Sequence, residues 1–107
     1  HLDDAEIAVV SFGAAARPSY GAVKKARDES IDAGLLRLRT LWPFPEKEIS
    51  DLSRRVDTII VPEMNAGKLV REVERASSGR TRVVSVPKIG GVLHSIDEIL
   101  GFIRRSL

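Results

Sequence analysis

Short runs of branched apolar residues alternate along the chain with longer stretches of helical spacing, and this pair of patterns is repeated four times. Each short run is followed by turn-forming residues, which is typical of a strand. Three of the runs are almost continuously apolar, which indicates strands covered on both faces of a sheet. The predicted strands are residues 6–12, 35–40, 57–61 and 82–86.

The stretches between and after these strands predict four helices. Ser95 and Glu98 form a capping box ahead of the last one, whose apolar residues recur at helical spacing. We expect Gly34 to supply the left-handed residue that ends the first one. The first helix is predicted at residues 19–33 and the third at 68–78, whereas the second begins at the corner formed by 43–45 and the fourth after Ser95.

This order of elements predicts a mainly parallel four-stranded sheet with right-handed crossovers and helices on both faces, which is a three-layer α/β/α sandwich. We expect residues 6–107 to form this single α/β domain, as a fragment of a longer chain, and residues 1–5 to be a disordered lead or an expression remnant. Ligands and partners of such sheets tend to meet the loops after the carboxyl ends of the strands. Those loops are residues 13–21, 41–45, 62–67 and 87–94.

The composition argues against several classes of protein. The 17 basic and 15 acidic residues are intermixed along the helices, so we expect no nucleic-acid surface. The longest apolar runs are strand-sized, far below the roughly 20 residues that cross a bilayer. No secretion signal is visible, and we therefore expect a cytoplasmic protein without a membrane partner. Because the sequence lacks cysteine, this chain alone cannot form disulfides or hold thiolate-ligated zinc or iron–sulfur clusters.

The loop at residues 13–21 leads into a helix N-terminus, where free backbone N–H groups can hold an anion. It contains neither of the glycine-rich phosphate-binding fingerprints. We favour a tight turn over a phosphate site here. Arg17 in this loop is a candidate for contacts with a neighbouring domain.

The segment 41–45 holds the only tryptophan, Trp42, close to Phe44 and two prolines. Prolines fix the backbone and aromatic rings offer rigid apolar area, a combination suited to packing. The two rings could pack on this domain's own core, on a neighbouring domain or around a small molecule.

The loops after the third and fourth strands offer single polar groups rather than a catalytic set. Glu63 is the only carboxylate at the end of its strand, and a lone acid serves as a helix cap as readily as a general base. Asn65 could cap the third helix, Gly67 allows close backbone approach, and the Gly-Gly pair at 90–91 favours a turn. We predict no catalytic residue and no metal site. The candidate domain or subunit interface comprises Arg17, Trp42, Phe44, Glu63, Asn65, Gly67, Gly90 and Gly91.

Four segments of the sequence resemble the C-terminal part of the alpha subunit of 2-oxoacid:ferredoxin oxidoreductases. Together they span nearly the whole chain, and the WPFP and EMN-x-G elements at their spacing are the most specific. The segments are SFGAAAR (11–17), AGLLRLRTLWPFPEKEI (33–49), VDTIIVPEMNAGKLVREV (56–73) and VPKIGGVLHSIDEIL (86–100).

The resemblance implies the fold of the transketolase C-terminal domain. In that fold the four parallel strands have the spatial order 2-1-3-4, and one additional antiparallel strand precedes them. Residues 2–5 are too short and too polar to be that strand. We therefore expect the second strand to lie at an open edge of the sheet.

The resemblance also implies part of an enzyme that oxidises a 2-oxoacid with coenzyme A to an acyl-CoA and carbon dioxide and passes the electrons to ferredoxin. Thiamine diphosphate, magnesium and iron–sulfur clusters are implied elsewhere in that enzyme, with none held by this chain. The implied partners are the remainder of the alpha subunit, the beta subunit, and a ferredoxin-type cluster subunit or ferredoxin. This chain would then be a non-catalytic assembly domain.

Two other functions fit the same residues. One is a small module whose loops 13–21 and 62–67 hold coenzyme A or a nucleotide by its phosphate. The other is the equivalent domain of a transketolase or a 2-oxoacid dehydrogenase.

Overall fold

The structure, a computed structural model, describes residues 5–38, 44–63, 68–87 and 95–106. Strands and helices alternate along these segments, as the sequence predicts. The elements are β1 (Ile7–Phe12), the short 3₁₀ helix η1 (Gly13–Ala15), α1 (Ala16–Asp28), β2 (Ala33–Leu38), α2 (Glu46–Ser53), β3 (Thr58–Glu63), α3 (Lys68–Ser77), β4 (Arg82–Pro87) and α4 (Ile96–Arg105).

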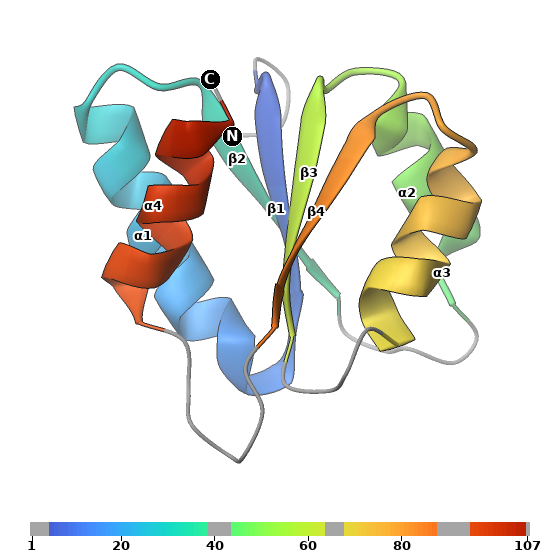
Figure 1. The fold of residues 1–107 in the computed structure, drawn as a ribbon, viewed down its shortest axis with the longest axis horizontal. Helices are drawn as coiled ribbons and strands as arrows, with labels where there is room; N and C mark the ends of the chain where they lie inside the picture. Colours follow the sequence, from blue (N-terminus) through green and yellow to red (C-terminus); the bar gives the residue numbers. More distant parts are fainter. Residues whose placement is uncertain (1–4, 39–43, 64–67, 88–94, 107) are drawn as a thin grey trace.

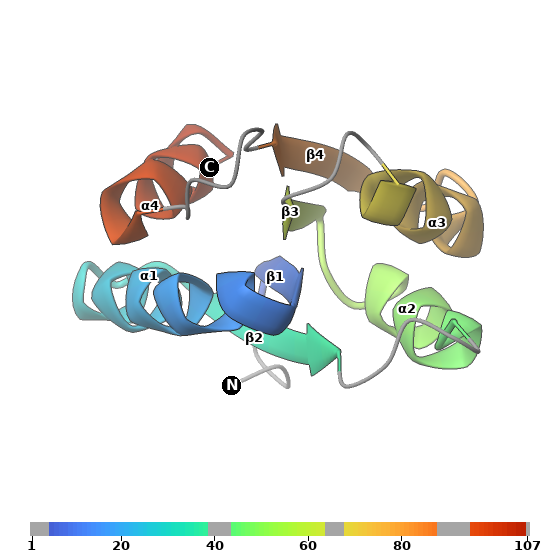
Figure 2. The ribbon, with the colours of Figure 1, turned by 90° about the horizontal axis from the view of Figure 1, so that it is seen from below.

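The four strands form one parallel sheet with the order β2-β1-β3-β4. Helices α1 and α4 cover one face, and α2 and α3 cover the other (Figure 1). The predicted three-layer sandwich and the strand order 2-1-3-4 are therefore confirmed. All four strands end at the lower side of Figure 1, and Figure 2 views the domain from that side.

The core consists of two apolar clusters, one on each face of the sheet. Along β1, Ile7 and Val9 belong to the cluster under α1 and α4, whereas Ala8 and Val10 belong to the cluster under α2 and α3. All of these side chains are buried because successive residues of a strand point to opposite faces. This two-sided burial is why the first strand is a continuous apolar run in the sequence.

Helices α2 and α3 each direct apolar residues toward the sheet. Ile49 and Leu52 of α2 are fully buried, and Val73 of α3 lies in the same cluster. Their helical spacing places them on the side of each helix that faces the sheet. Leu69 and Val70 extend this contact toward the start of α3.

Helix α4 begins with the predicted capping box. The backbone N–H of Glu98 donates to Ser95 Oγ at 3.1 Å, and the backbone N–H of Ser95 donates to Glu98 Oε1 at 3.2 Å. These bonds satisfy two backbone groups that the first helical turn leaves free. Arg104 and Arg105 lie in the last turn, where positive charge is favourable.

Helix α1 differs from its prediction at both ends. It begins at Ala16, ahead of Pro18, because a proline in the first turn lacks only an N–H that has no partner within the helix. It ends at Asp28, and Ser30 takes the left-handed conformation at φ 64°. Gly34 lies inside β2, so the prediction that it caps this helix is wrong.

Helices α1 and α4 approach each other closely at a glycine. A Cβ atom built on Gly21 would lie 2.6 Å from Cδ1 and 2.9 Å from Cγ1 of Ile96. Any side chain at position 21 would therefore force the Ile96 side chain to shift. Ile96 in turn packs on the cluster that contains Ile99 and Ile103.

Strand β2 lies at one edge of the sheet and pairs only with β1. In the segments that the structure describes, no strand pairs with its outer edge. Strand β4 forms the opposite edge and pairs only with β3.

Alanine substitutions at two helical glycines test the α1–α4 contact. Alanine is favoured over glycine in a helix by about 1 kcal/mol. At Gly101 an added Cβ meets nothing closer than Arg105 Nη2 at 3.8 Å. We expect Gly101→Ala to raise the free energy of unfolding by about 1 kcal/mol and Gly21→Ala to lower it by about as much, since overpacking costs about 1–3 kcal/mol. Chemical denaturation measures both, and equal gains would contradict the contact.

Candidate interface at the carboxyl edge of the sheet

The predicted interface residues fall into two groups. Arg17, Phe44 and Glu63 belong to the described parts of the chain. Trp42, Asn65, Gly67, Gly90 and Gly91 lie outside the described residues, and their assignments stay predictions.

Phe44 packs within its own domain. It is half-buried and lies against the apolar cluster under α2 and α3. It also lines a depression of about 510 Å³ together with Glu72 and Arg75 of α3. Of the three environments that the sequence left open for this segment, Phe44 therefore lies in contact with the core of its own domain.

A second depression lies where β1 and β2 end. Its described lining is Phe12, Gly13, Arg37 and Leu38, and its volume is about 470 Å³. Phe12 and Leu38 are paired in the register of the two strands. Phe12 is 38% exposed, a large value for a phenylalanine at the end of a central strand. Sequence reasoning missed this site, although a bulky apolar residue directly before a turn glycine was the available signal.

The turn from β1 into α1 leaves a helix start without a side-chain cap. Phe12 is extended, Gly13 has a positive φ of 64°, and the chain enters α1 through η1. No acidic residue lies in the first turn of α1, whereas Arg17 does. A positive charge at this end of a helix is unfavourable by about 0.3–1 kcal/mol. Local electrostatics therefore do not explain why an arginine is placed here.

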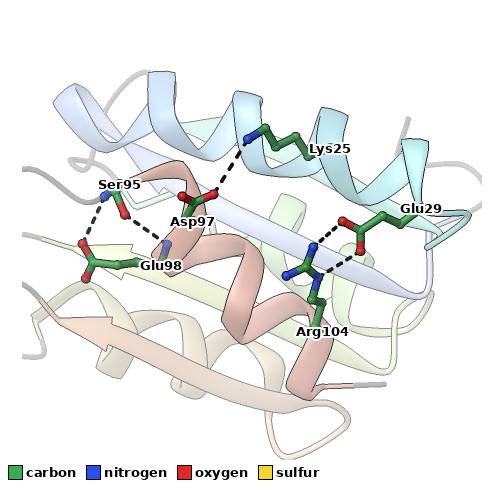
Figure 3. Close-up of polar contacts among 6 residues, drawn as sticks. All are labelled: Lys25, Glu29, Ser95, Asp97, Glu98 and Arg104. Carbon is green, nitrogen blue, oxygen red and sulfur yellow. Dashed lines mark hydrogen bonds and ion pairs between the residues drawn. The ribbon is translucent and has the colours of Figure 1, made fainter.

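Other charged side chains are engaged within the layers of the fold. Arg104 of α4 donates through Nε to Glu29 of α1 at 2.9 Å and also contacts the second carboxylate oxygen, and Lys25 lies 3.8 Å from Asp97 (Figure 3). These contacts join the two helices along their exposed side. Exposed pairs of this kind contribute about 0–1 kcal/mol each.

The opposite helical layer has a corresponding contact. Arg75 of α3 lies 2.9 Å from Glu72 and 2.7 Å from Glu46 of α2. Hydrogen bonds to Glu72 and then to Glu46 raise the pKa of the Arg75 guanidinium, which is charged at any physiological pH. Arg80 adds a bond from Nη2 to Ser50 Oγ at 2.6 Å.

Arg17 and Arg37 differ from these residues because neither has an ion pair among the residues that the structure describes. Both are exposed and lie at the carboxyl edge of the sheet, Arg37 near the end of β2 and Arg17 at the start of α1. The described part of this edge therefore combines exposed apolar surface with uncompensated positive charge.

The described residues offer no catalytic set. None of them form a group of three His, Cys, Asp or Glu side chains that could hold a metal ion. Glu63 ends β3 in register with Pro87. Within the same segments, every helix falls short of the length and apolarity that a membrane-spanning helix requires.

The parallel sheet, its strand order and its paired helical layers define a domain of the transketolase C-terminal type. A split-gene transketolase in an inactive beta4 tetramer has this fold, with a TM-score of 0.84 at 15% identity over 98% of this chain and 40% of that chain. The 2-oxoglutarate:ferredoxin oxidoreductase from Magnetococcus marinus also has it, with a TM-score of 0.78 at 16% identity over 95% of this chain and 18% of that chain. The fold expected from the sequence is thus confirmed.

Sequence comparison gives the family. The chain belongs to the family of pyruvate:ferredoxin oxidoreductase core domain II, whose model matches residues 5–99. It is 47% identical to the 2-oxoglutarate synthase subunit KorA of Methanothermobacter marburgensis, over 92% of this chain and 26% of that subunit. It is 41% identical to the ketoisovalerate oxidoreductase subunit VorB of Methanothermobacter thermautotrophicus, over 96% of this chain and 29% of that subunit. The chain thus spans about a quarter of the length of the curated relatives that it matches.

The pair of Glu29 and Arg104 predicts a pH dependence of stability. The hydrogen bond from Arg104 lowers the pKa of the Glu29 carboxyl below its ordinary value. The stabilisation is therefore present above the pKa of an unfolded glutamate, about 4.3, and is lost as the pH falls through the lower folded value. We expect Glu29→Gln to be less stable than the parent near neutral pH and equally stable near pH 2. Thermal unfolding across pH measures this.

Asp28→Asn is the matched control, since Asp28 is the neighbouring exposed carboxylate and has no ion pair in the described structure. It should show no loss near neutral pH. A Glu29→Gln deficit that persists in acid would contradict the assignment.

The buried hydroxyl of Ser11 gives a prediction about hydrogen bonding. It is fully buried and has no hydrogen-bond partner among the described residues. An unsatisfied buried hydroxyl costs about 1–3 kcal/mol. We expect Ser11→Ala to leave the free energy of unfolding unchanged or raise it by up to about 1 kcal/mol. Ser53→Ala is the control: Ser53 Oγ donates to Ser50 O at 2.7 Å and accepts from Arg80 Nε at 3.2 Å. Its loss should lower stability by about 1 kcal/mol, and an equal loss at Ser11 would reveal a partner there.

Proposed function

We propose that this chain is a non-catalytic assembly domain in the alpha subunit of a cytoplasmic, thiamine-diphosphate-dependent 2-oxoacid:ferredoxin oxidoreductase. That enzyme converts a 2-oxoacid and coenzyme A into an acyl-CoA and carbon dioxide and reduces ferredoxin. The observation that carries the proposal is the match of the core domain II family model to residues 5–99. Curated relatives whose names denote 2-oxoacid oxidoreductase subunits support it.

Relatives that are named for different substrates support an assembly function for this domain. This chain corresponds to 26% of a 2-oxoglutarate synthase subunit and 29% of a ketoisovalerate oxidoreductase subunit. These two relatives are named for different 2-oxoacids, and they match this domain at 47% and 41% identity. A domain that tolerates this change of substrate is not expected to select the substrate. We infer that substrate contacts lie in the remaining part of the subunit or in its partners.

The cofactors are proposed to bind elsewhere for a reason of donor chemistry. Iron–sulfur clusters are held mainly by cysteine thiolates, and this sequence has no cysteine. Magnesium with a diphosphate takes carboxylate and carbonyl oxygens, and the described residues form no carboxylate cluster of that kind. We therefore place thiamine diphosphate, magnesium and the clusters in other parts of the enzyme. The partners of this domain are then the remainder of the alpha subunit, the beta subunit, and a cluster-bearing subunit or ferredoxin.

The proposal is tested on the full alpha subunit assembled with its partner subunits. We expect coenzyme A-dependent reduction of ferredoxin when the complex is given a panel of pyruvate, 2-oxoglutarate and 2-oxoisovalerate. Calorimetry of the 107-residue chain with thiamine diphosphate and magnesium is the companion measurement, and it should show no binding. Micromolar affinity of the isolated chain would contradict a non-catalytic assembly function, and a complex inactive on every 2-oxoacid would contradict the enzyme class.

A further inference from the structure

We propose that the depression at the ends of β1 and β2 binds an acidic segment from the remainder of the same subunit, with a carboxylate on Arg37 and an apolar side chain against Phe12. This inference rests on the proposed function, because it requires that the chain is part of a longer alpha subunit. The edge site is defined here as Phe12, Arg37 and Leu38, which line the depression, together with Arg17 at the start of α1.

The apolar half of the edge site is exposed where the fold could have buried it. Phe12 and Tyr20 are the large hydrophobic residues exposed among the described ones, and Phe12 lies in the central strand β1. Every other residue of β1 is buried. A phenylalanine side chain contributes roughly 1.5–3 kcal/mol when it is removed from water. Because Phe12 is 38% exposed, the domain obtains only part of this stabilisation. A partner that covers Phe12 would bury the remaining apolar area.

The charged half of the edge site has no compensation within the described structure. Arg75 and Arg104 on the helical layers each contact a glutamate. Arg37, which lines the same depression as Phe12, has no such contact among the described residues, and neither has Arg17. Arg17 also lies in the first turn of α1, where a positive charge is disfavoured. Because Arg17 is unfavourable for its own helix, we expect it to contact something outside that helix.

The arrangement selects the chemistry of the occupant. A guanidinium binds a carboxylate through two parallel N–H···O bonds, and such charge-assisted pairs are stronger than neutral ones. The start of α1 adds the positive end of the helix dipole at the same edge, and Figure 2 shows α1 beginning beside the end of β1. An aspartate or glutamate next to an apolar residue matches both halves of the edge site.

The source of the occupant follows from the length of the chain. The relatives extend over about four times the matched region, since the match covers 26% of the 2-oxoglutarate synthase subunit. A segment of the same polypeptide is held near the edge site at high effective concentration, so a small contact area suffices to keep it bound. This favours the remainder of the alpha subunit over a separate protein.

Carbodiimide cross-linking of the full alpha subunit tests the inference. This reagent joins an amine to a carboxylate that is already in contact, so the Arg37→Lys variant converts the proposed ion pair into a covalent link. We expect mass spectrometry to find position 37 joined to an Asp or Glu outside residues 1–107. Arg82→Lys is the matched control, since Arg82 is an exposed arginine of the other edge strand, at the amino end of the sheet. Links from position 37 only to residues within 1–107, or no more links than from position 82, would overturn the proposal.

Limited proteolysis of the full subunit is the second measurement. It uses variants that weaken the proposed contact instead of cross-linking it. In the full subunit, Arg37→Glu and Phe12→Ser should each speed the proteolytic release of this domain roughly tenfold, as expected for the loss of a charge-assisted or apolar contact. Arg82→Glu should leave the rate unchanged. Equal rates for all three variants and the parent would reject docking at this site. These outcomes are independent of ferredoxin reduction, so an active complex without cross-links would reject the edge site and leave the proposed function standing.

Discussion

The burial of both faces of the central strands is the constraint on which the rest of the structure depends. Ile7 to Val10 of β1 and Ile59 to Val61 of β3 are fully or almost fully removed from water. A parallel sheet with two apolar faces is stable only when both are covered, which requires a pair of helices on each side. Because all four strands are parallel, each helix returns the chain to the end of the sheet at which the previous strand began. Connections from the strand ends therefore gather at one edge.

The two ends of the sheet consequently have different physical character. Along the helical layers, ion pairs join neighbouring helices, as in the pairs of Glu29 with Arg104 and Glu46 with Arg75. At the carboxyl edge the described residues include an exposed phenylalanine and arginines without ion pairs. The exposed ion pairs thus link helices within the domain, whereas the described carboxyl edge leaves apolar area and positive charge without a partner. This division is what a domain needs if it is to be stable by itself and also held by a larger protein.

The fold could be predicted because it follows from short-range patterns. Continuous apolar runs identified the strands, and the Ser95–Glu98 capping box located α4 within a residue. The ends of α1 were missed: the chain turns at Gly13 and enters the helix at Ala16, and the helix ends at Asp28, ahead of the left-handed Ser30 rather than at Gly34. The edge site was only partly predicted: Arg17 was named, but Phe12 and Arg37 become neighbours through the register of β1 with β2. No local pattern encodes such a pairing between distant segments. The assignments of Trp42, Asn65, Gly67, Gly90 and Gly91 stay predictions.

The contact between Gly21 and Ile96 has a consequence for how sequences of this domain can diverge. The two residues belong to the first and last quarters of the sequence, yet they lie against each other between α1 and α4. A larger residue at position 21 requires the Ile96 side chain to shift or to be replaced by a smaller one, so the two positions are coupled. Lineages that carry an alanine or serine at position 21 should therefore carry a residue smaller than isoleucine at position 96 more often than lineages that keep the glycine. The distance between α1 and α4 therefore depends on the combined size of the residues at positions 21 and 96.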